Sequence, residues 1–294
     1  MQIVTKNLSY VYSPKSKELS VSAIKDISLT IEEGDFFGII GHTGSGKSTF
    51  VQHLNGLIKI QKNSGTITIG EFDLTDKKCD FKALREKVGM VFQYPEYQLF
   101  AETVFEDIAF GLKNFNKNLT KEEVENAVRS AMEFVGLDYF EYKDKSPFSL
   151  SGGQKRRVAI AGVIVSKPEV LILDEPVAGL DPKGKKEFIS LLHHLKKSLV
   201  KTIVIVSHDM NLVSENCSKV AVFDKGGVKK VGSPKEIFLS DNQIEETGLE
   251  LPITARLTKT LLDKKGVEIA SDLTSENFVK SVVFALKNGG KRVR

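Results

Sequence analysis

A chain of 294 residues is long enough to bury a sizeable core and to hold one large domain with a small addition. Hydrophobic residues make up 41% of the chain and charged residues 27%, which excludes a disordered or collagen-like protein. The formal net charge of +4 is too small to call for a nucleic-acid or lipid partner by itself.

The first third of the chain is predicted to form short strands joined by turns. Ile27–Ile31 alternates apolar and polar residues, and Thr66–Ile69 does the same between Gly65 and Gly70. Alternation is typical of strands with one buried face, so we expect a small antiparallel sheet near the N-terminus.

Four runs are short and almost wholly apolar, as strands buried on both faces of a parallel sheet are. These runs are Phe36–Ile40, Val88–Phe92, Val170–Leu173 and Ile203–Val206. Because helical patterns separate them, we expect an α/β domain.

Between Glu102 and Ser149 the pattern becomes helical and more polar. Thr120 and Glu123 have the spacing of a capping box, which predicts a helix that ends near Gly136. This stretch interrupts the α/β alternation, so we expect an inserted helical subdomain at about residues 95–157.

The sheet pattern fades after residue 232. Pro252 and Gly266 bound one predicted helix, whose apolar face carries Ile253, Leu257 and Leu261. A second helix before Gly289 is predicted from the spacing of Phe278, Val282 and Leu286. Residues 1–235 are therefore interpreted as the main domain and residues 236–294 as a small helical appendage.

Cysteine use and hydropathy indicate where the protein works. Cys79 and Cys217 lie far apart without metal-ligand spacing, so we expect a reducing compartment and no disulfide. The polar residues of Met1–Val11 do not fit a signal peptide, and the longest apolar run, Val158–Val165, is far shorter than the ~20 residues of a membrane span. We expect a soluble protein that reaches a membrane only through a partner.

A phosphate-binding loop is predicted from the run Gly41-His42-Thr43-Gly44-Ser45-Gly46-Lys47-Ser48, which has the form GxxxxGK[ST]. An apolar strand precedes it and the helical pattern of Thr49–Leu57 follows. The glycines let backbone N–H groups surround a phosphate, and the helix N-terminus adds its dipole. We expect Lys47 to neutralise the β- and γ-phosphates of ATP, and the Ser48 hydroxyl to ligate Mg²⁺.

Two carboxylates follow the apolar run Val170–Leu173. Asp174 is expected to hold Mg²⁺ through water, and Glu175 to polarise the attacking water as a general base. Two acids after an apolar run are also a common strand end, but the phosphate-binding loop upstream favours the functional interpretation.

The run Leu150-Ser151-Gly152-Gly153-Gln154 identifies a family. At about 5% for each residue type, such a match arises by chance in about one chain in ten thousand of this length. It is the signature of ATP-binding-cassette (ABC) ATPases, which this chain resembles from about Asn7 to Gly232. The signature offers hydroxyl and backbone donors at a helix start. The resemblance implies a P-loop NTPase fold in which this surface faces the γ-phosphate held by a second subunit.

Further positions match the family in order. Gln93 matches the Q-loop glutamine, which touches metal or water and senses the membrane partner. Asp181 lies in Ala178-Gly179-Leu180-Asp181, which matches the D-loop of the dimer interface but has Ala-Gly where Ser-Ala is commoner. His208 matches the switch histidine on the γ-phosphate. Tyr12 matches the aromatic residue that stacks on adenine, and Tyr10 is the competing candidate.

The remaining histidines and basic runs are interpreted as structural. His53 lies on the helix after the loop, and His193 and His194 have no further ligands nearby for zinc. Lys155-Arg156-Arg157 is predicted to be a solvated helix face or a support on the phosphate side rather than a nucleic-acid contact.

Exclusion narrows the class within the family. Translation factors of the family carry two cassettes, whereas this chain has one. Chromosome-maintenance members have a long coiled coil between the phosphate-binding loop and the signature. Here the interval from Lys47 to Ser151 is short and lacks sustained heptads. Exporters often carry a fused membrane span. A separate ATPase subunit that docks on a membrane protein remains.

Four stretches are similar to the second ATPase subunit of energy-coupling factor (ECF) transporters, including the cobalt-uptake type. They are Phe92–Phe100, Pro147–Leu150, Arg156–Gly162 and Ala178–Pro182. The resemblance implies ATP-driven uptake of vitamins or transition-metal ions at the cytoplasmic face of the cell membrane. The implied partners are a second ATPase of similar sequence, in a heterodimer rather than a homodimer, a membrane coupling protein and a substrate-capturing membrane protein. The appendage would hold the two ATPases together.

Docking on the membrane partner is expected beside Gln93, with apolar contacts from Tyr97, Leu99 and Phe100. Two alternatives stay open. One is the ATPase of an ordinary ABC importer, and the other is a soluble, DNA-associated ABC ATPase.

Overall fold

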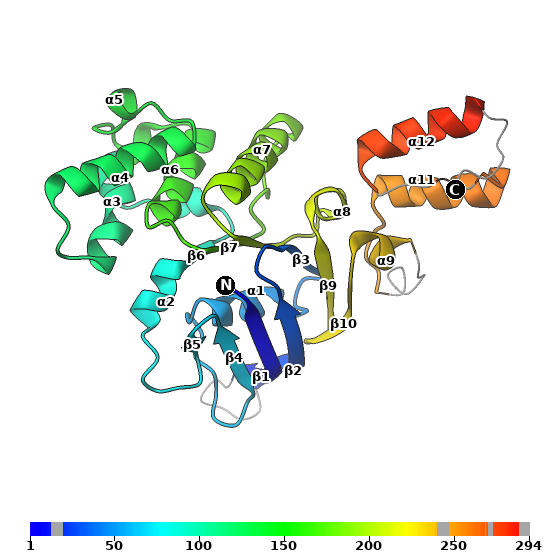
Figure 1. The fold of residues 1–294 in the computed structure, drawn as a ribbon, viewed down its shortest axis with the longest axis horizontal. Coiled ribbons are helices and arrows are strands. Elements are labelled where there is room, and N and C mark those ends of the chain that lie inside the picture. Colours follow the sequence, from blue (N-terminus) through cyan, green and yellow to red (C-terminus); the bar gives the residue numbers. More distant parts are fainter. Residues whose placement is uncertain (13–19, 240–246, 268, 270–272, 288–294) are drawn as a thin grey trace.

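A computed structural model describes residues 1–12, 20–239, 247–267, 269 and 273–287. Two sheets lie below and behind a group of helices, and a pair of C-terminal helices projects to one side (Figure 1). None of the helices in these ranges has both the length and the apolar character that a membrane span requires.

The smaller sheet is antiparallel and lies at the N-terminal end of the chain, as predicted. It contains β1 (Ile3–Tyr12), β2 (Val21–Ile31), β4 (Thr66–Ile69) and β5 (Phe72–Asp73) in the order β2-β1-β4-β5. Apolar residues on alternate positions of its strands are buried in a core that this sheet shares with the larger one.

The larger sheet has the order β10-β9-β3-β8-β7-β6. The parallel neighbours β3, β8, β7 and β6 confirm the four predicted runs. These strands are β3 (Phe36–Gly41), β6 (Val88–Val91), β7 (Val170–Asp174) and β8 (Thr202–Val206). The hairpin of β9 (Lys219–Asp224) and β10 (Gly227–Gly232) extends the sheet beside β3 and was not predicted. Because β3, β7 and β8 are parallel neighbours, their carboxyl ends meet at one edge.

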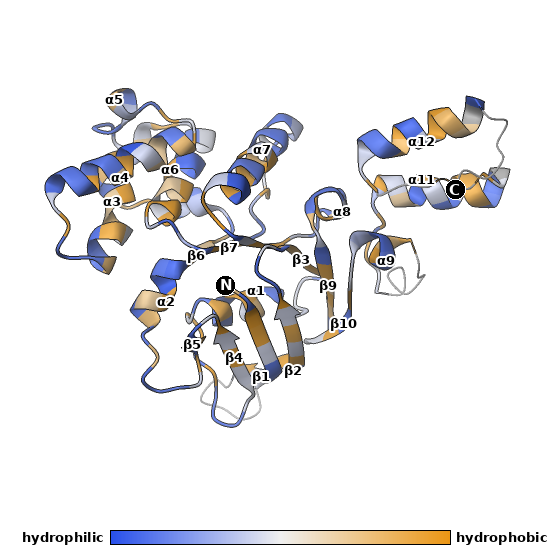
Figure 2. Cartoon of the chain, in the orientation of Figure 1, coloured by the Kyte–Doolittle hydropathy of each residue, from blue (hydrophilic) through white to orange (hydrophobic). Residues whose placement is uncertain are grey.

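Both faces of the larger sheet are covered, which explains its continuous apolar runs. In β8, Ile203 and Ile205 belong to one core, whereas Val204 and Val206 belong to the other. The first core includes residues of α6 (Gly152–Ile164) and α7 (Pro182–Ser198), and the second includes residues of α1 (Lys47–Leu54) and the antiparallel sheet. Figure 2 shows hydrophobic residues concentrated in the strands between these layers.

The expected helices of residues 95–157 lie together on one side of the larger sheet (Figure 1). They are η2 (Pro95–Gln98), α3 (Val104–Phe115), α4 (Lys121–Phe134), α5 (Tyr139–Tyr142), η3 (Pro147–Ser149) and the start of α6. The capping box is confirmed, because Thr120 Oγ1 accepts from Glu123 N at 3.2 Å and Glu123 Oε2 accepts from Thr120 N at 2.7 Å. Gly136 follows the helix with a φ of 73°.

Short helices complete the main body. α2 (Phe81–Lys87) precedes β6, α8 (Met210–Asn216) follows β8, and α9 (Pro234–Phe238) follows β10. Ile237 and Phe238 of α9 are fully buried in the same core as residues of α8. The division of the chain at 235/236 stays a prediction.

The two predicted C-terminal helices are α11 (Ile253–Lys265) and α12 (Ser275–Lys287). Gly266 ends α11 with a φ of 62°, as expected. Phe278 and Val282 of α12 pack with Leu261 of α11 in a small core of their own. The predicted contact of the Leu286 side chain and the position of Gly289 lie outside the described residues.

The C-terminal helices are attached to α8. Ile253 N donates to Asn211 Oδ1 at 2.8 Å, and the Ser275 hydroxyl donates to the carboxylate of Glu215. Since α8 directly follows the segment that carries His208, the appendage is bonded to an element next to the predicted site.

Candidate functional site

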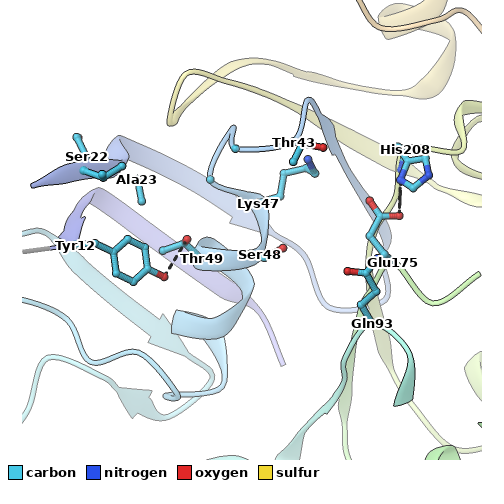
Figure 3. A pocket seen from close by; sticks show the side chains of 13 residues that line it. Tyr12, Ser22, Ala23, Thr43, Lys47, Ser48, Thr49, Gln93, Glu175 and His208 are labelled. Atoms are coloured by element: carbon cyan, nitrogen blue, oxygen red, sulfur yellow. Dashed lines mark hydrogen bonds and ion pairs between the residues drawn. The ribbon is translucent and has the colours of Figure 1, made fainter. Parts of the chain in front are cut away.

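A cavity of about 450 Å³ lies beside the loop between β3 and α1 (Figure 3). Its walls are Tyr12, Val21, Ser22, Ala23, Thr43, Gly44, Gly46, Lys47, Ser48, Thr49, Gln93, Glu175 and His208. Tyr12 stands at one end, Gln93, Glu175 and His208 stand at the other, and Lys47 and Ser48 lie between them (Figure 3). Residues from six segments of the sequence thus line one cavity, and five of these segments carry a residue that the motifs singled out.

The loop between β3 and α1 takes a conformation that requires glycine. Gly46 has a φ of 98°, and a Cβ atom there would lie 2.4 Å from the carbonyl oxygen of Ala23 in β2. A Cβ atom at Gly41, whose φ is 152°, would lie 2.3 Å from the carbonyl oxygen of Phe223. Neighbouring backbone on both sides therefore fixes the loop ahead of the first turn of α1.

The ammonium group of Lys47 is held inside this loop. Its Nζ donates to the carbonyl oxygens of Gly41 and His42, each at 2.7 Å. Burial lowers the pKa of Lys47, and the nearby carboxylates of Glu175 and Asp174 partly oppose that effect. A partly desolvated cation at the start of a helix is a strong attractor for an anion such as phosphate.

Asp174 ends β7 beneath the loop and lacks a full set of partners. It is buried, and its Oδ1 has no hydrogen-bond partner among the described residues. Desolvation raises the pKa of this carboxyl group, and a hydrogen bond with Ser48 acts in the opposite direction. A buried carboxylate oxygen without a partner, close to a hydroxyl, suits a hard cation such as Mg²⁺, which prefers oxygen ligands.

Glu175 points into the cavity from a strained position. Its φ is 48°, in the left-handed region that costs a non-glycine residue of order 1–3 kcal/mol. The Oε2 atom lies 2.9 Å from His208 Nδ1 and accepts from His208 N at 3.4 Å. The Glu175 side chain is only 13% exposed, whereas that of His208 is 71% exposed. The carboxylate is thus placed to take a proton, and the imidazole is free to contact a ligand.

The position of Tyr12 distinguishes it from its rival Tyr10. The Tyr12 ring is exposed at the cavity, where its hydroxyl lies 3.3 Å from Thr49 Oγ1. Tyr10 is not among the lining residues, and its ring packs edge-on against His53 and Tyr12. The geometry favours Tyr12 as the platform for adenine.

We expect Tyr12→Ala to weaken ATP binding roughly fivefold to a hundredfold, because stacking on an aromatic ring contributes about 1–3 kcal/mol to the free energy of binding a base. Titration calorimetry with ATP would measure this, and the affinity for inorganic tripolyphosphate should stay unchanged. Tyr12→Phe, which keeps the ring, should bind ATP nearly as well as the original chain. If Tyr10→Ala weakened ATP binding more than Tyr12→Ala, the assignment would be wrong.

Residues 150–154 do not line this cavity. Ser151 caps α6, accepting from Gln154 N at 3.4 Å, and Gln154 Oε1 accepts from Ser151 N at 2.9 Å. A Cβ atom at Gly152 or Gly153 would meet nothing within 4 Å. Packing within the described chain therefore gives no reason for glycine at either position.

Four other predicted nucleotide-binding residues also lie outside the cavity wall. Gly41 and Ser45 are covered by the loop itself, and His42 lies beside Gly248. Asp181 caps α7, where its Oδ1 accepts from Gly184 N at 2.7 Å. Their roles toward ATP stay predictions.

Three expectations about other residues change. Arg156 is only 5% exposed, so the prediction of a solvated helix face is wrong for it; its partner Glu96 lies 60 residues away, beyond the reach of local patterns. Leu99 is buried, so that only Tyr97 and Phe100 of the three predicted docking residues are exposed. Sequence reasoning also missed Ser22 and its neighbours at the start of β2, which lie before the alternating run Ile27–Ile31 and carry no motif.

Comparison with known proteins gives one consistent result. The family model described as "ABC transporter" matches residues 24–178. An energy-coupling factor transporter ATP-binding protein, EcfA2, of Clostridioides difficile is 46% identical over 98% of this chain and 99% of its own length. EcfA2 of Caldanaerobacter subterraneus is 46% identical over all of both chains.

Solved structures agree with these relatives. cbiO1 from Clostridium perfringens, described as part of the ABC transporter complex cbiONQ, has a TM-score of 0.72 and 39% identity, and covers 87% of this chain and 98% of its own. The dimeric bacterial ABC transporter cassette MJ0796 has a TM-score of 0.69 and 30% identity, and covers 79% of this chain and 98% of its own.

Proposed function

This chain belongs to the ABC transporter family and, within it, is an ATPase subunit of the energy-coupling factor type; from that premise we propose that it hydrolyses ATP as one half of a nucleotide-sandwiching dimer. The observation that carries the proposal is the separation of two phosphate-binding surfaces. Lys47 lies in the cavity, whereas Gly152 and Gly153 lie outside it with open space in front of them. Two subunits related by a two-fold axis bring each surface to the other's nucleotide.

Within one half-site, each group has a distinct task. Tyr12 stacks on adenine, and Lys47 with the loop N–H groups of residues 44–48 binds the β- and γ-phosphates. Ser48, Gln93 and Asp174 would hold Mg²⁺, which offsets the charge of the phosphate oxygens when it is bound.

Hydrolysis then depends on the two residues at the far end of the cavity. Glu175 takes a proton from the attacking water while the water oxygen bonds to the γ-phosphorus and the bond from that phosphorus to the bridging oxygen of ADP breaks. His208 contacts the γ-phosphate, and Ser151 with Gly152 and Gly153 of the partner ATPase contacts it from the other side. Loss of the γ-phosphate removes these contacts, so the two nucleotide-binding faces separate. This closing and opening is the motion that drives transport.

An aromatic surface beside Gln93 supports docking on a membrane coupling protein. Tyr97 is 83% exposed, and the exposed rings of Phe100 and Phe110 meet edge to face with their centroids 4.8 Å apart. Clustered exposed aromatic residues are typical of interaction sites. A membrane protein docked on this surface would lie close to Gln93, which is part of the cavity wall.

The C-terminal helices support a lasting contact with a partner ATPase of similar sequence, in a heterodimer. Six large apolar side chains of α11 and α12 remain exposed. They are Ile253, Leu257, Leu262, Val279, Val283 and Phe284. The assembly would stand at the cytoplasmic face of the membrane, with vitamins or transition-metal ions captured by another membrane protein and without a nucleic-acid partner.

Purification of the tagged chain from detergent-solubilised membranes tests this function. We expect a second, non-identical ATPase, a membrane coupling protein and a substrate-capturing membrane protein to copurify. Tyr97→Ala combined with Phe100→Ala should lose the membrane proteins and keep the second ATPase. Phe140→Ala, which removes an exposed ring elsewhere on the helical subdomain, is the matched control.

Other outcomes of that purification point to the alternatives. A like-subunit dimer on a dedicated permease would indicate an ordinary importer. Recovery away from membranes, with DNA binding that weakens steeply as salt rises, would indicate a DNA-associated ATPase.

A further inference from the structure

One buried guanidinium group joins three segments around the site. Arg156 in α6 donates from Nε and Nη2 to the two carboxylate oxygens of Glu96, at 3.0 and 2.9 Å. Its Nη1 also donates to the carbonyl oxygen of Pro176 at 3.2 Å, and its Nη2 to that of Ala178 at 3.1 Å. Only arginine offers this many donors in a rigid planar fork.

The two carbonyl groups belong to the turn that carries Glu175. This turn is closed by the bond from Ala178 N to the carbonyl oxygen of Glu175 at 3.2 Å. The left-handed backbone of Glu175 is strained, and such strain persists only where the surroundings hold it. Arg156 supplies two of the bonds that hold the turn immediately after Glu175.

The other side of the guanidinium group reaches the docking surface. Glu96 lies in η2, three residues after Gln93 and next to exposed Tyr97. The same two segments also lie close together, because a Cβ atom added at Gly179 would lie 3.4 Å from the ring of Tyr94. The segment that follows Gln93 and the turn that follows Glu175 therefore meet at Arg156.

We propose that Arg156 is a positioning residue for Glu175 and that Glu96 fixes its orientation, so that residues 95–100 set the rate of ATP hydrolysis without touching ATP. The inference rests on the proposed role of Glu175 as general base. A general base that is displaced by a fraction of an ångström is no longer aligned with the attacking water, and the reaction slows. A partner seated on Tyr97 would thereby speed or slow hydrolysis through Glu96.

Arg156→Lys tests the proposal, because lysine keeps the charge but loses the fork that binds four acceptors. We expect kcat for ATP hydrolysis to fall about tenfold to a hundredfold, while KM and the affinity for ATP change less than twofold. The measurement uses the full-length chain in the assembly that hydrolyses ATP. The matched control is Arg157→Lys, since among the described residues Arg157 donates hydrogen bonds to Val135 O and Glu187 and not to either segment.

A double-mutant cycle with Glu96→Gln identifies the path. If Glu96 acts through Arg156, the double variant should be no slower than Arg156→Lys alone. A normal kcat in Arg156→Lys would overturn the proposal. A fall in kcat accompanied by weaker ATP binding and a lower melting temperature would also overturn it, because that is the result expected for a merely structural ion pair. Normal turnover in Glu175→Gln would instead refute the general base, whatever Arg156→Lys does.

Discussion

Lys47→Ala is expected to lower ATP hydrolysis by at least about a hundredfold and to weaken ATP binding. The lysine supplies the positive charge between the loop and the carboxylates, and removing one preorganised donor from a site of this kind costs 10²–10³ in rate. Hydrolysis is measured as phosphate release at saturating ATP, and binding by calorimetry. Lys59→Ala, at an exposed lysine beyond α1, is the control and should hydrolyse ATP normally.

The same variant should keep its fold. Burial lowers the pKa of Lys47, so the folded chain disfavours the charged ammonium relative to the unfolded chain. Below the lowered pKa the buried ammonium costs stability, and this cost shrinks as the pH rises from the pKa of the folded chain toward the ordinary value of 10.5. We therefore expect a melting temperature at pH 7 no lower than that of the original chain. A variant that turned over ATP normally would refute the phosphate role.

Glu175→Gln should reduce hydrolysis by about 10²–10⁴, the usual contribution of a general base, and leave ATP bound. Glutamine keeps the size of the side chain, so the cavity beside His208 should still close on ATP and Mg²⁺. Without cleavage the γ-phosphate contacts persist. Cross-linking between the nucleotide-binding faces of the two ATPases should then show a closed dimer that forms with ATP and not with ADP.

Ser151→Ala added to this variant separates the two phosphate-binding surfaces. The ATP-dependent dimer should weaken, whereas the affinity of the single subunit for ATP should not change, because Ser151 lies outside its own cavity. Equal loss of both would mean that the signature acts within its own chain. A Glu175→Gln variant that stayed monomeric in ATP would count against the sandwich.

Local patterns predicted the elements whose reason lies in nearby residues. The apolar runs of β3, β6, β7 and β8 are continuous because both faces of those strands are buried. β10 escaped prediction because it is an edge strand whose lysines look like solvated surface, whereas the buried apolar run Val220–Phe223 of β9 was overlooked.

The site divides in the same way. Lys47, Asp174 and Glu175 lie in short motifs, each next to the strand that positions it. Arg156 and Glu96 are placed together by the packing of α6 on η2, and no spacing within one segment reports that contact. Packing likewise decided that Leu99 turns inward while Phe110, one helix later, remains at the surface.

The open space before Gly152 and Gly153 has a genetic consequence. Alanine at either place would meet no neighbour among the residues that the structure describes, so such an allele should express and melt like the original. Its damage would fall on the nucleotide carried by the other subunit. Produced alongside the normal chain, the altered chain would still enter dimers and would impair ATP hydrolysis in its partner subunit. We therefore expect these alleles to be dominant negative and not recessive.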